Sequence, residues 1–206
     1  MSDLKLKHIS LTKLRGTAYK TLFGGKPDKL FPFHTFNEEN DAYLIDVFIY
    51  PLNLEEFPGR VVAAVTNGMS DYVMNDSKTG EQSRCELIQY FHDCDYEHAE
   101  RLYDLAWMPL FDRFSLAEYQ TIEMPDAVVP NSPLKNAFFL PPLLKPHQCF
   151  RVDIEGMPVR FLWHVPISDV ELHYKKDRDA NSLIQRMQAV ELPWIFDEAE
   201  RPPLVE

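Results

Sequence analysis

The sequence is poor in cysteine and glycine and has no long hydrophobic run. Its three cysteines, Cys85, Cys94 and Cys149, are odd in number and form no Cys-x-x-Cys pair, which argues against a disulfide framework or a zinc ribbon. Its seven glycines match neither dinucleotide-binding nor P-loop spacing. No segment approaches the roughly 20 apolar residues of a membrane helix, and the N-terminus lacks the apolar core of a signal peptide. We therefore expect a cytosolic protein with no cofactor and no membrane contact.

Basic residues are also scarce. Lys and Arg number 21 against 32 Asp and Glu, which gives a formal net charge of −11. This charge opposes the counterion release that drives nucleic-acid binding, so we expect no nucleic-acid partner. It would attract a basic protein, although an acidic surface also serves solubility. With 45% hydrophobic residues, the 206-residue chain can bury a sizeable core, and we predict one domain over residues 1–206.

The pattern of apolar residues predicts helices and strands in alternating groups. A helical region is predicted over 4–22, and a helix over 96–110 with Asp95 as its N-cap and Pro109 ending or kinking it. The other predicted elements are strands over 42–51, 60–66, 84–91, 119–124, 136–144 and 157–166 and a final helix over 179–190. This order predicts an α+β fold with a mixed or antiparallel central sheet flanked by helices.

The C-terminal part carries a separate helix-start signal. Ser168-x-x-Glu171 is a capping box, so a helix is predicted to begin there. In the tail after the last predicted helix, we expect Trp194 and Ile195 to dock on the core while the last residues fray.

The segment TNGMSD, residues 66–71, lies between two predicted buried strands. Ser70 and Asp71 could be combined with a histidine into a hydrolase triad, but the segment is not Gly-x-Ser-x-Gly. Ser and Asp beside Asn-Gly are typical of a tight turn. We therefore predict that Gly68 has a backbone conformation with positive φ or close approach, and that Ser70 and Asp71 fasten the turn.

The densest polar cluster, HDCDYEH, contains His92, Asp93, Asp95 and His98. These residue types can bind zinc or act in hydrolysis, but the six-residue spacing of the histidines differs from that of His-Glu-x-x-His. A metal-binding protein or hydrolase using these four residues is an alternative hypothesis. We favour the interpretation in which Asp93 and Asp95 cap the following helix. His164, inside an apolar strand, is interpreted as a core histidine.

Six segments together resemble the suppressor of fused domain family, and its bacterial single-domain members most closely. They are LFGGKPDKLF, VVAAVTNGMSDYVM, RCELIQYF, NAFFLPPLL, VRFLWHVPISDVELHYKKDRDANSLIQRM and LPWIFDEAERPPL, in the family's order and over nearly the whole chain. The resemblance implies a mixed central sheet flanked by helices, like the family's N-terminal domain, and no catalytic activity. In animals the related protein represses Hedgehog signalling by holding a transcription-factor segment as an added strand between two domains. Only the first of these domains has a counterpart here.

Bacterial relatives are proposed, from genome neighbourhoods, to be immunity proteins that neutralise toxins. The leading hypothesis is therefore a non-enzymatic cytosolic domain that captures a protein partner, such as a basic toxin domain, at a sheet edge or in a groove beside the Gly68 turn. The candidate contact residues, chosen for their place in or next to the family motif, are Met69, Ser70, Asp71 and Tyr72. A further alternative is a homodimeric scaffold with no other partner.

Overall fold

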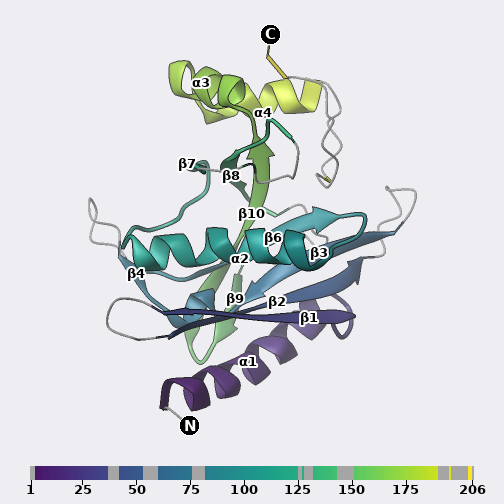
Figure 1. Ribbon diagram of the computed structural model, residues 1–206, viewed down its shortest axis with the longest axis vertical. Helices are drawn as coiled ribbons and strands as arrows, with labels where there is room; N and C mark the ends of the chain where they lie inside the picture. Colours follow the sequence, from purple (N-terminus) through teal and green to yellow (C-terminus); the bar gives the residue numbers. More distant parts are fainter. Residues whose placement is uncertain are drawn as a thin grey trace.

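A computed structural model shows a mixed sheet with helices on both faces (Figure 1). It describes residues 3–36, 42–52, 60–75, 82–124, 127, 132–142, 151–189, 195 and 204–205. The helices are α1 (Asp3–Leu22), α2 (Tyr96–Phe111), α3 (Asp169–Asp177) and α4 (Ala180–Ala189), with a short 3-10 turn, η1 (Met69–Asp71). The strands are β1 (Lys29–Phe36), β2 (Ala42–Leu52), β3 (Val61–Asn67), β4 (Met74–Asn75), β5 (Gln82–Ser83), β6 (Cys85–Phe91), β7 (Thr121–Glu123), β8 (Asn136–Leu140), β9 (Arg151–Ile154) and β10 (Met157–Ile167).

The main sheet has the strand order β1-β2-β3-β6-β10-β8-β7, and β9 pairs with the first part of β10. Its neighbouring strands are antiparallel except β6 and β10, which run parallel. The strands β4 and β5 form a separate two-stranded sheet. The predicted α+β class and the mixed sheet are confirmed.

Each face of the sheet packs against its own set of helices. On β3, Val61, Ala63 and Val65 belong to a core cluster that also contains buried residues of α1, α3 and α4. Val62 and Ala64, which alternate with them, belong to a second cluster that contains the apolar face of α2. Because successive strand residues point to opposite faces, this central strand is buried on both sides. Figure 1 shows α2 across the middle of the sheet, α1 at the N-terminal end of the molecule, and α3 and α4 at the opposite end.

Two strands of the main sheet were not predicted. β1 contains Pro32, which cannot donate to a strand ladder and is tolerated at an edge. β1 is an edge strand: Phe31 and Phe33 pack toward α2, whereas Leu30 and Pro32 are exposed. β9 is only four residues long, and two of the four are charged, so its sequence carries little strand signal. It is a strand because it forms a hairpin with β10.

The helix predicted over 96–110 extends to Phe111, so Pro109 neither ends it nor stops the last turn from forming. Asp95 is its N-cap, as predicted, since its side chain accepts a hydrogen bond from the His98 N–H at 3.0 Å. None of the described helices is long and apolar enough to cross a membrane.

The capping box at Ser168 and Glu171 is confirmed. The Ser168 hydroxyl accepts from the Glu171 N–H at 3.3 Å, and the Glu171 carboxylate accepts from the Ser168 N–H at 2.7 Å. Glu171 also accepts from the Leu204 N–H at 3.3 Å, and Leu204 is buried. The prediction that the last residues fray is therefore wrong at Leu204. Ile195 docks as predicted, whereas Trp194 lies outside the described residues.

His164 is a buried core residue, as predicted. Its Nδ1 lies 2.7 Å from the Gln89 side-chain oxygen, and burial lowers its pKa to about 3. An unfolded histidine has a pKa of about 6.5. The stability contributed by neutral His164 is therefore complete above pH 6.5 and is lost as the pH falls toward 3, because only the unfolded chain then takes up the proton.

We expect this histidine to steepen acid destabilisation by up to about 1.4 kcal/mol per pH unit below pH ~6. Urea unfolding measured from neutral to acidic pH should show a shallower slope for His164→Gln than for the wild-type protein. The exposed His173 provides the control, since His173→Gln should retain the wild-type slope. Equal slopes for all three proteins would contradict the prediction.

Candidate functional site

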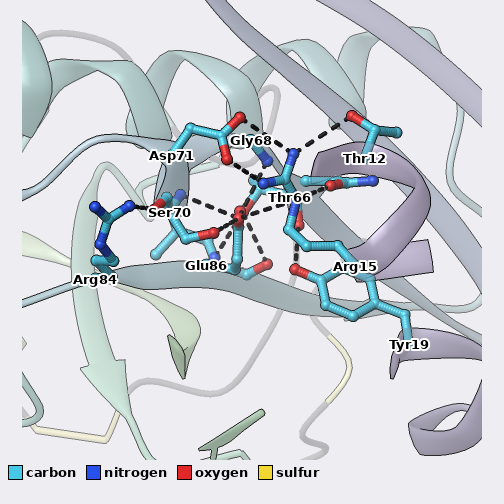
Figure 2. A network of polar contacts seen from close by, with 11 residues as sticks. Thr12, Arg15, Tyr19, Thr66, Gly68, Ser70, Asp71, Arg84 and Glu86 are labelled. Carbon is cyan, nitrogen blue, oxygen red and sulfur yellow. Dashed lines mark hydrogen bonds and ion pairs between the residues drawn. The ribbon is translucent and has the colours of Figure 1, made fainter. Parts of the chain in front are cut away.

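Glu86, in the strand β6, is fully buried and is surrounded by hydrogen-bond donors from the TNGMSD segment (Figure 2). The Thr66 hydroxyl donates to its Oε2 at 2.7 Å. The N–H groups of Gly68 and Ser70 donate to its Oε1 at 3.1 and 3.0 Å, and the Ser70 hydroxyl donates to the same oxygen at 2.5 Å. Four donors thus satisfy a carboxylate that would otherwise be costly to bury.

Gly68 allows this arrangement. Its φ of 138° lies in the region that favours glycine, and it lets the chain turn from β3 into η1 with the Gly68 and Ser70 N–H groups aimed at one oxygen. The prediction of positive φ at Gly68 is confirmed. Ser70 and Asp71 fasten the turn, as expected, through their side-chain contacts to Glu86 and Arg15 and through the local hydrogen bond from the Asp71 N–H to the Gly68 carbonyl at 3.1 Å.

Arg15 joins the helix α1 to this turn. It is fully buried and donates to the Asp71 carboxylate and to the Asn67 side-chain oxygen, and its Nε lies 4.0 Å from Glu86 Oε1. A further contact, at 3.3 Å, reaches the Thr12 hydroxyl on the same helix. Figure 2 shows the Arg15 side chain reaching from α1 toward the carboxylates of Asp71 and Glu86. The carboxylates of Asp71 and Glu86 therefore lie beside the one buried guanidinium group of Arg15.

Burial and charge act in opposite directions in this cluster. Burial on its own lowers the pKa of Arg15, but the carboxylates of Glu86 and Asp71 raise it further, so Arg15 stays charged. Burial raises the pKa of Glu86, while Arg15 and the hydrogen bonds from Ser70, Thr66 and Gly68 lower it. The sequence analysis missed Arg15 and Glu86. The signal that could have identified them was Glu86 itself, a glutamate inside a largely apolar strand. A charged residue in such a place seldom lacks a partner, so Glu86 predicts a cation or hydrogen-bond donors nearby.

The contacts of this cluster hold the turn and do not form a hydrolase triad. The Ser70 hydroxyl donates to a carboxylate instead of to a histidine, so it is not arranged as the nucleophile of a triad. Met69 and Ser70 are buried, whereas Asp71 and Tyr72 are partly exposed. Of the four predicted contact residues, only Asp71 and Tyr72 thus present surface to a partner. A contact at any of them remains a prediction.

In the HDCDYEH cluster, the two aspartates make local contacts: Asp95 caps α2 and Asp93 accepts a hydrogen bond within a turn. Asp95 accepts from the His98 N–H and lies 2.7 Å from its Nδ1, and the backbone hydrogen bond lowers the Asp95 pKa. The N-cap of α2 is Asp95, whereas Asp93 accepts from the Cys94 N–H at 3.0 Å and lies 3.5 Å from the Lys29 ammonium. His92 is exposed. In the described part of the chain, no group of three or more His, Cys, Asp or Glu side chains is arranged to hold a metal ion.

A groove of about 370 Å³ lies directly beside the turn. One wall is the segment that follows Ser70, and the other is the C-terminal end of α2. Its lining residues are Asp71, Tyr72, Val73, Met74, Asn75, Pro109, Leu110, Arg113 and Phe114. The surface of the groove is polar and apolar in similar measure: Asp71, Asn75 and Arg113 lie in its lining beside Val73 and Phe114. Val73, at 38% exposure, is accessible there.

The backbone is unusual at the α2 end of this groove. Arg113 has a φ of 57°, a left-handed conformation that few non-glycine residues adopt. The turn is closed by hydrogen bonds from the Asp112 N–H to the Met108 carbonyl at 2.8 Å and from the Phe114 N–H to the Pro109 carbonyl at 3.1 Å. This helix end places Arg113 and Phe114 in the groove wall, at the cost of some backbone strain.

Comparison with known proteins identifies a family match and similar folds. The family model described as suppressor of fused protein (SUFU) matches residues 42–201. Comparison with curated proteins finds no match. A SUFU homolog from Neisseria gonorrhoeae FA 1090 is 18% identical, with a TM-score of 0.70 over 96% of this chain and 98% of that chain.

Two further solved structures share the fold. In the Sufu–Fu complex crystal structure, the similar chain is 13% identical, with a TM-score of 0.66 over 95% of this chain and 91% of that one. Drosophila Suppressor of Fused is 14% identical, with a TM-score of 0.58 over 77% of this chain but only 42% of the Drosophila chain. At these identities, the structural likeness is evidence for the fold alone.

Proposed function

The chain belongs to the suppressor of fused family, and on this premise we propose that it is a non-enzymatic, cytosolic protein-binding domain that holds a partner segment in the groove beside β4. The observation that carries the proposal is the groove itself. It combines apolar side chains with polar ones, it is open to solvent at Val73, and it is built next to the TNGMSD segment. A domain of this fold has been crystallised with another protein, as the Sufu–Fu complex, which supports a binding role.

The strand β4 offers a way to bind an extended segment. Within the described residues, β4 pairs only with β5, and both of its residues, Met74 and Asn75, line the groove. A segment in the groove can use backbone groups on the other side of β4 for strand addition, while Leu110 and Phe114 provide apolar contacts. The strained conformation of Arg113 also supports a binding role, because such strain gathers at functional sites.

The partner that fits the protein's overall charge is a basic protein, and a basic toxin domain held by an immunity protein is the specific form of this proposal. The net charge of −11 would accelerate encounter with such a partner. The reduced, buried thiols of Cys85 and Cys94 fit a cytosolic location. A homodimeric scaffold is the alternative, and it would appear as a stable dimer in light scattering with no heterologous partner.

The test uses the purified product of the neighbouring gene and isothermal titration. We expect binding that weakens as salt is added, and at least tenfold weaker binding for Val73→Asp, because the substitution places a charge in an apolar contact. Val170 on α3 is also exposed, at 52%, so Val170→Asp provides a matched control that should bind like the wild-type protein. Equal affinity of the two variants would overturn the proposed groove.

A further inference from the structure

Val73 also lines a second, larger groove, of about 630 Å³, whose charge is opposite to that of the protein as a whole. Three arginines, Arg84, Arg151 and Arg160, contribute to its lining. The other lining residues are Gln82, Ser83, Ser115, Leu116, Ala117, Met157 and Pro158. The described lining residues include three arginines and no carboxylate. This groove is therefore positively charged in a chain whose net charge is −11.

The sheet itself brings the three arginines together. Arg160 on β10 lies directly opposite Arg151 on β9, and on its other side it lies opposite Cys85, the residue after Arg84. The Arg160 N–H donates to the Arg84 carbonyl at 3.0 Å. Neighbouring strands are about 4.8 Å apart, so the backbones of Arg151 and Arg160 lie close together, and Arg84, directly before β6, lies next to them.

These charges are not compensated within the described part of the chain. Three other arginines of the described region, Arg15, Arg60 and Arg101, have carboxylate partners. Among the described residues, no carboxylate forms an ion pair with Arg84, Arg151 or Arg160. Like charges placed directly opposite each other destabilise a pair of strands. The Ser83 hydroxyl, in the same lining, also lacks a hydrogen-bond partner in the described region.

We propose that this second groove binds an acidic segment of a protein, with its carboxylates paired to Arg151 and Arg160. The guanidinium group can hold a carboxylate through two parallel hydrogen bonds, and Met157 and Pro158 offer apolar surface to the rest of the segment. Arg84 already donates to the Ser70 carbonyl at 2.5 Å, so it links the groove to the TNGMSD segment and leaves the main contacts to the other two arginines. A long polyanion such as nucleic acid is disfavoured, since the protein as a whole repels it.

This proposal goes beyond the groove beside β4 and stands independently of it. A partner that meets both grooves must present an extended segment to one and an acidic segment to the other. Such a requirement would exclude partners that carry only basic charge.

The test measures the fluorescence anisotropy of labelled hexaglutamate, with labelled hexaglutamine as the neutral probe, at an ionic strength of about 0.02 M, where screening is weak. We expect saturable binding of hexaglutamate only, and at least tenfold weaker binding to Arg151→Gln/Arg160→Gln. The control Lys20→Gln/Arg178→Gln removes the same charge from exposed positions and should bind like the wild-type protein. Circular dichroism of each variant verifies that it is folded.

Three results would overturn the proposal. They are no saturable binding of hexaglutamate, an equal loss of binding in the two double variants, or tighter binding of tripolyphosphate, added as a competitor, than of hexaglutamate. The last result would assign the groove to a small phosphate compound. These probes need no natural partner, so this test and the titration of the groove beside β4 can fail separately. A failure of one proposal is therefore distinguishable from a failure of the other.

Discussion

Replacing Glu86 with alanine is expected to lower the free energy of unfolding by about 3–5 kcal/mol, the usual effect of breaking a buried ion pair from one side. The substitution leaves the buried guanidinium of Arg15 with less compensating charge. It also removes the acceptor for the Thr66 hydroxyl and for the N–H groups of Gly68 and Ser70. Equilibrium urea unfolding, followed by circular dichroism, measures the change.

Two further variants show whether the effect comes from the carboxylate. Glu86→Gln keeps the shape but presents an amide N–H₂ group to donors, so we expect an intermediate loss of about 1–3 kcal/mol. Glu100 is exposed on α2, and Glu100→Ala should change stability by less than about 0.5 kcal/mol. A Glu86→Ala protein as stable as Glu100→Ala would show that the buried cluster does not support the fold.

Replacing Arg15 with methionine should have a comparable effect, about 3 kcal/mol or more, because it leaves the carboxylates of Asp71 and Glu86 close together without a cation. The double variant Arg15→Met/Glu86→Gln should lose less stability than the sum of the single changes, by about 0.5–3 kcal/mol. The reason is that the double variant contains neither the guanidinium of Arg15 without Glu86 nor the carboxylate of Glu86 without Arg15. Lys20→Met, at an exposed position on the same helix, is the control for helix propensity. Strict additivity of the two changes would contradict the coupling seen in the structure.

The buried cluster of Arg15, Asp71 and Glu86 is also connected to the groove beside β4. Asp71 pairs with Arg15 on one side and lines the groove on the other. A variant that loosens η1 should therefore weaken partner binding, even though Arg15 and Glu86 are themselves fully buried. The TNGMSD segment is, on this account, mainly the support of a binding surface, to which it contributes Asp71.

The sequence predicts the elements that have strong local signals. The helix α2 has an apolar face and an N-cap at Asp95, and α3 begins with a capping box. The predicted bounds of α2 and the predicted start of α3 therefore agree closely with the structure. β1 was missed because Pro32 argues against a strand, and only pairing with β2 overrides this signal. β9 was missed because so short a segment, with charged residues at two of its four positions, becomes a strand only beside β10.

The sites depend on residues that meet only in the folded chain. Arg15 and Glu86 come from α1 and β6, and no local spacing relates them. Both grooves are likewise formed by segments that are distant in the sequence. The sequence did identify TNGMSD as a turn of structural importance, but burial of Met69 and Ser70, which decides which residues a partner can reach, follows only from tertiary packing.

The most direct test of the central claim is amide hydrogen exchange of the domain, alone and in complex with its protein partner. The account predicts that exchange slows at least tenfold at residues 72–75 and 109–114, the two walls of the groove beside β4, when the partner binds. Protection confined to the outer strands β1 or β7, with unchanged exchange at both groove walls, would contradict it.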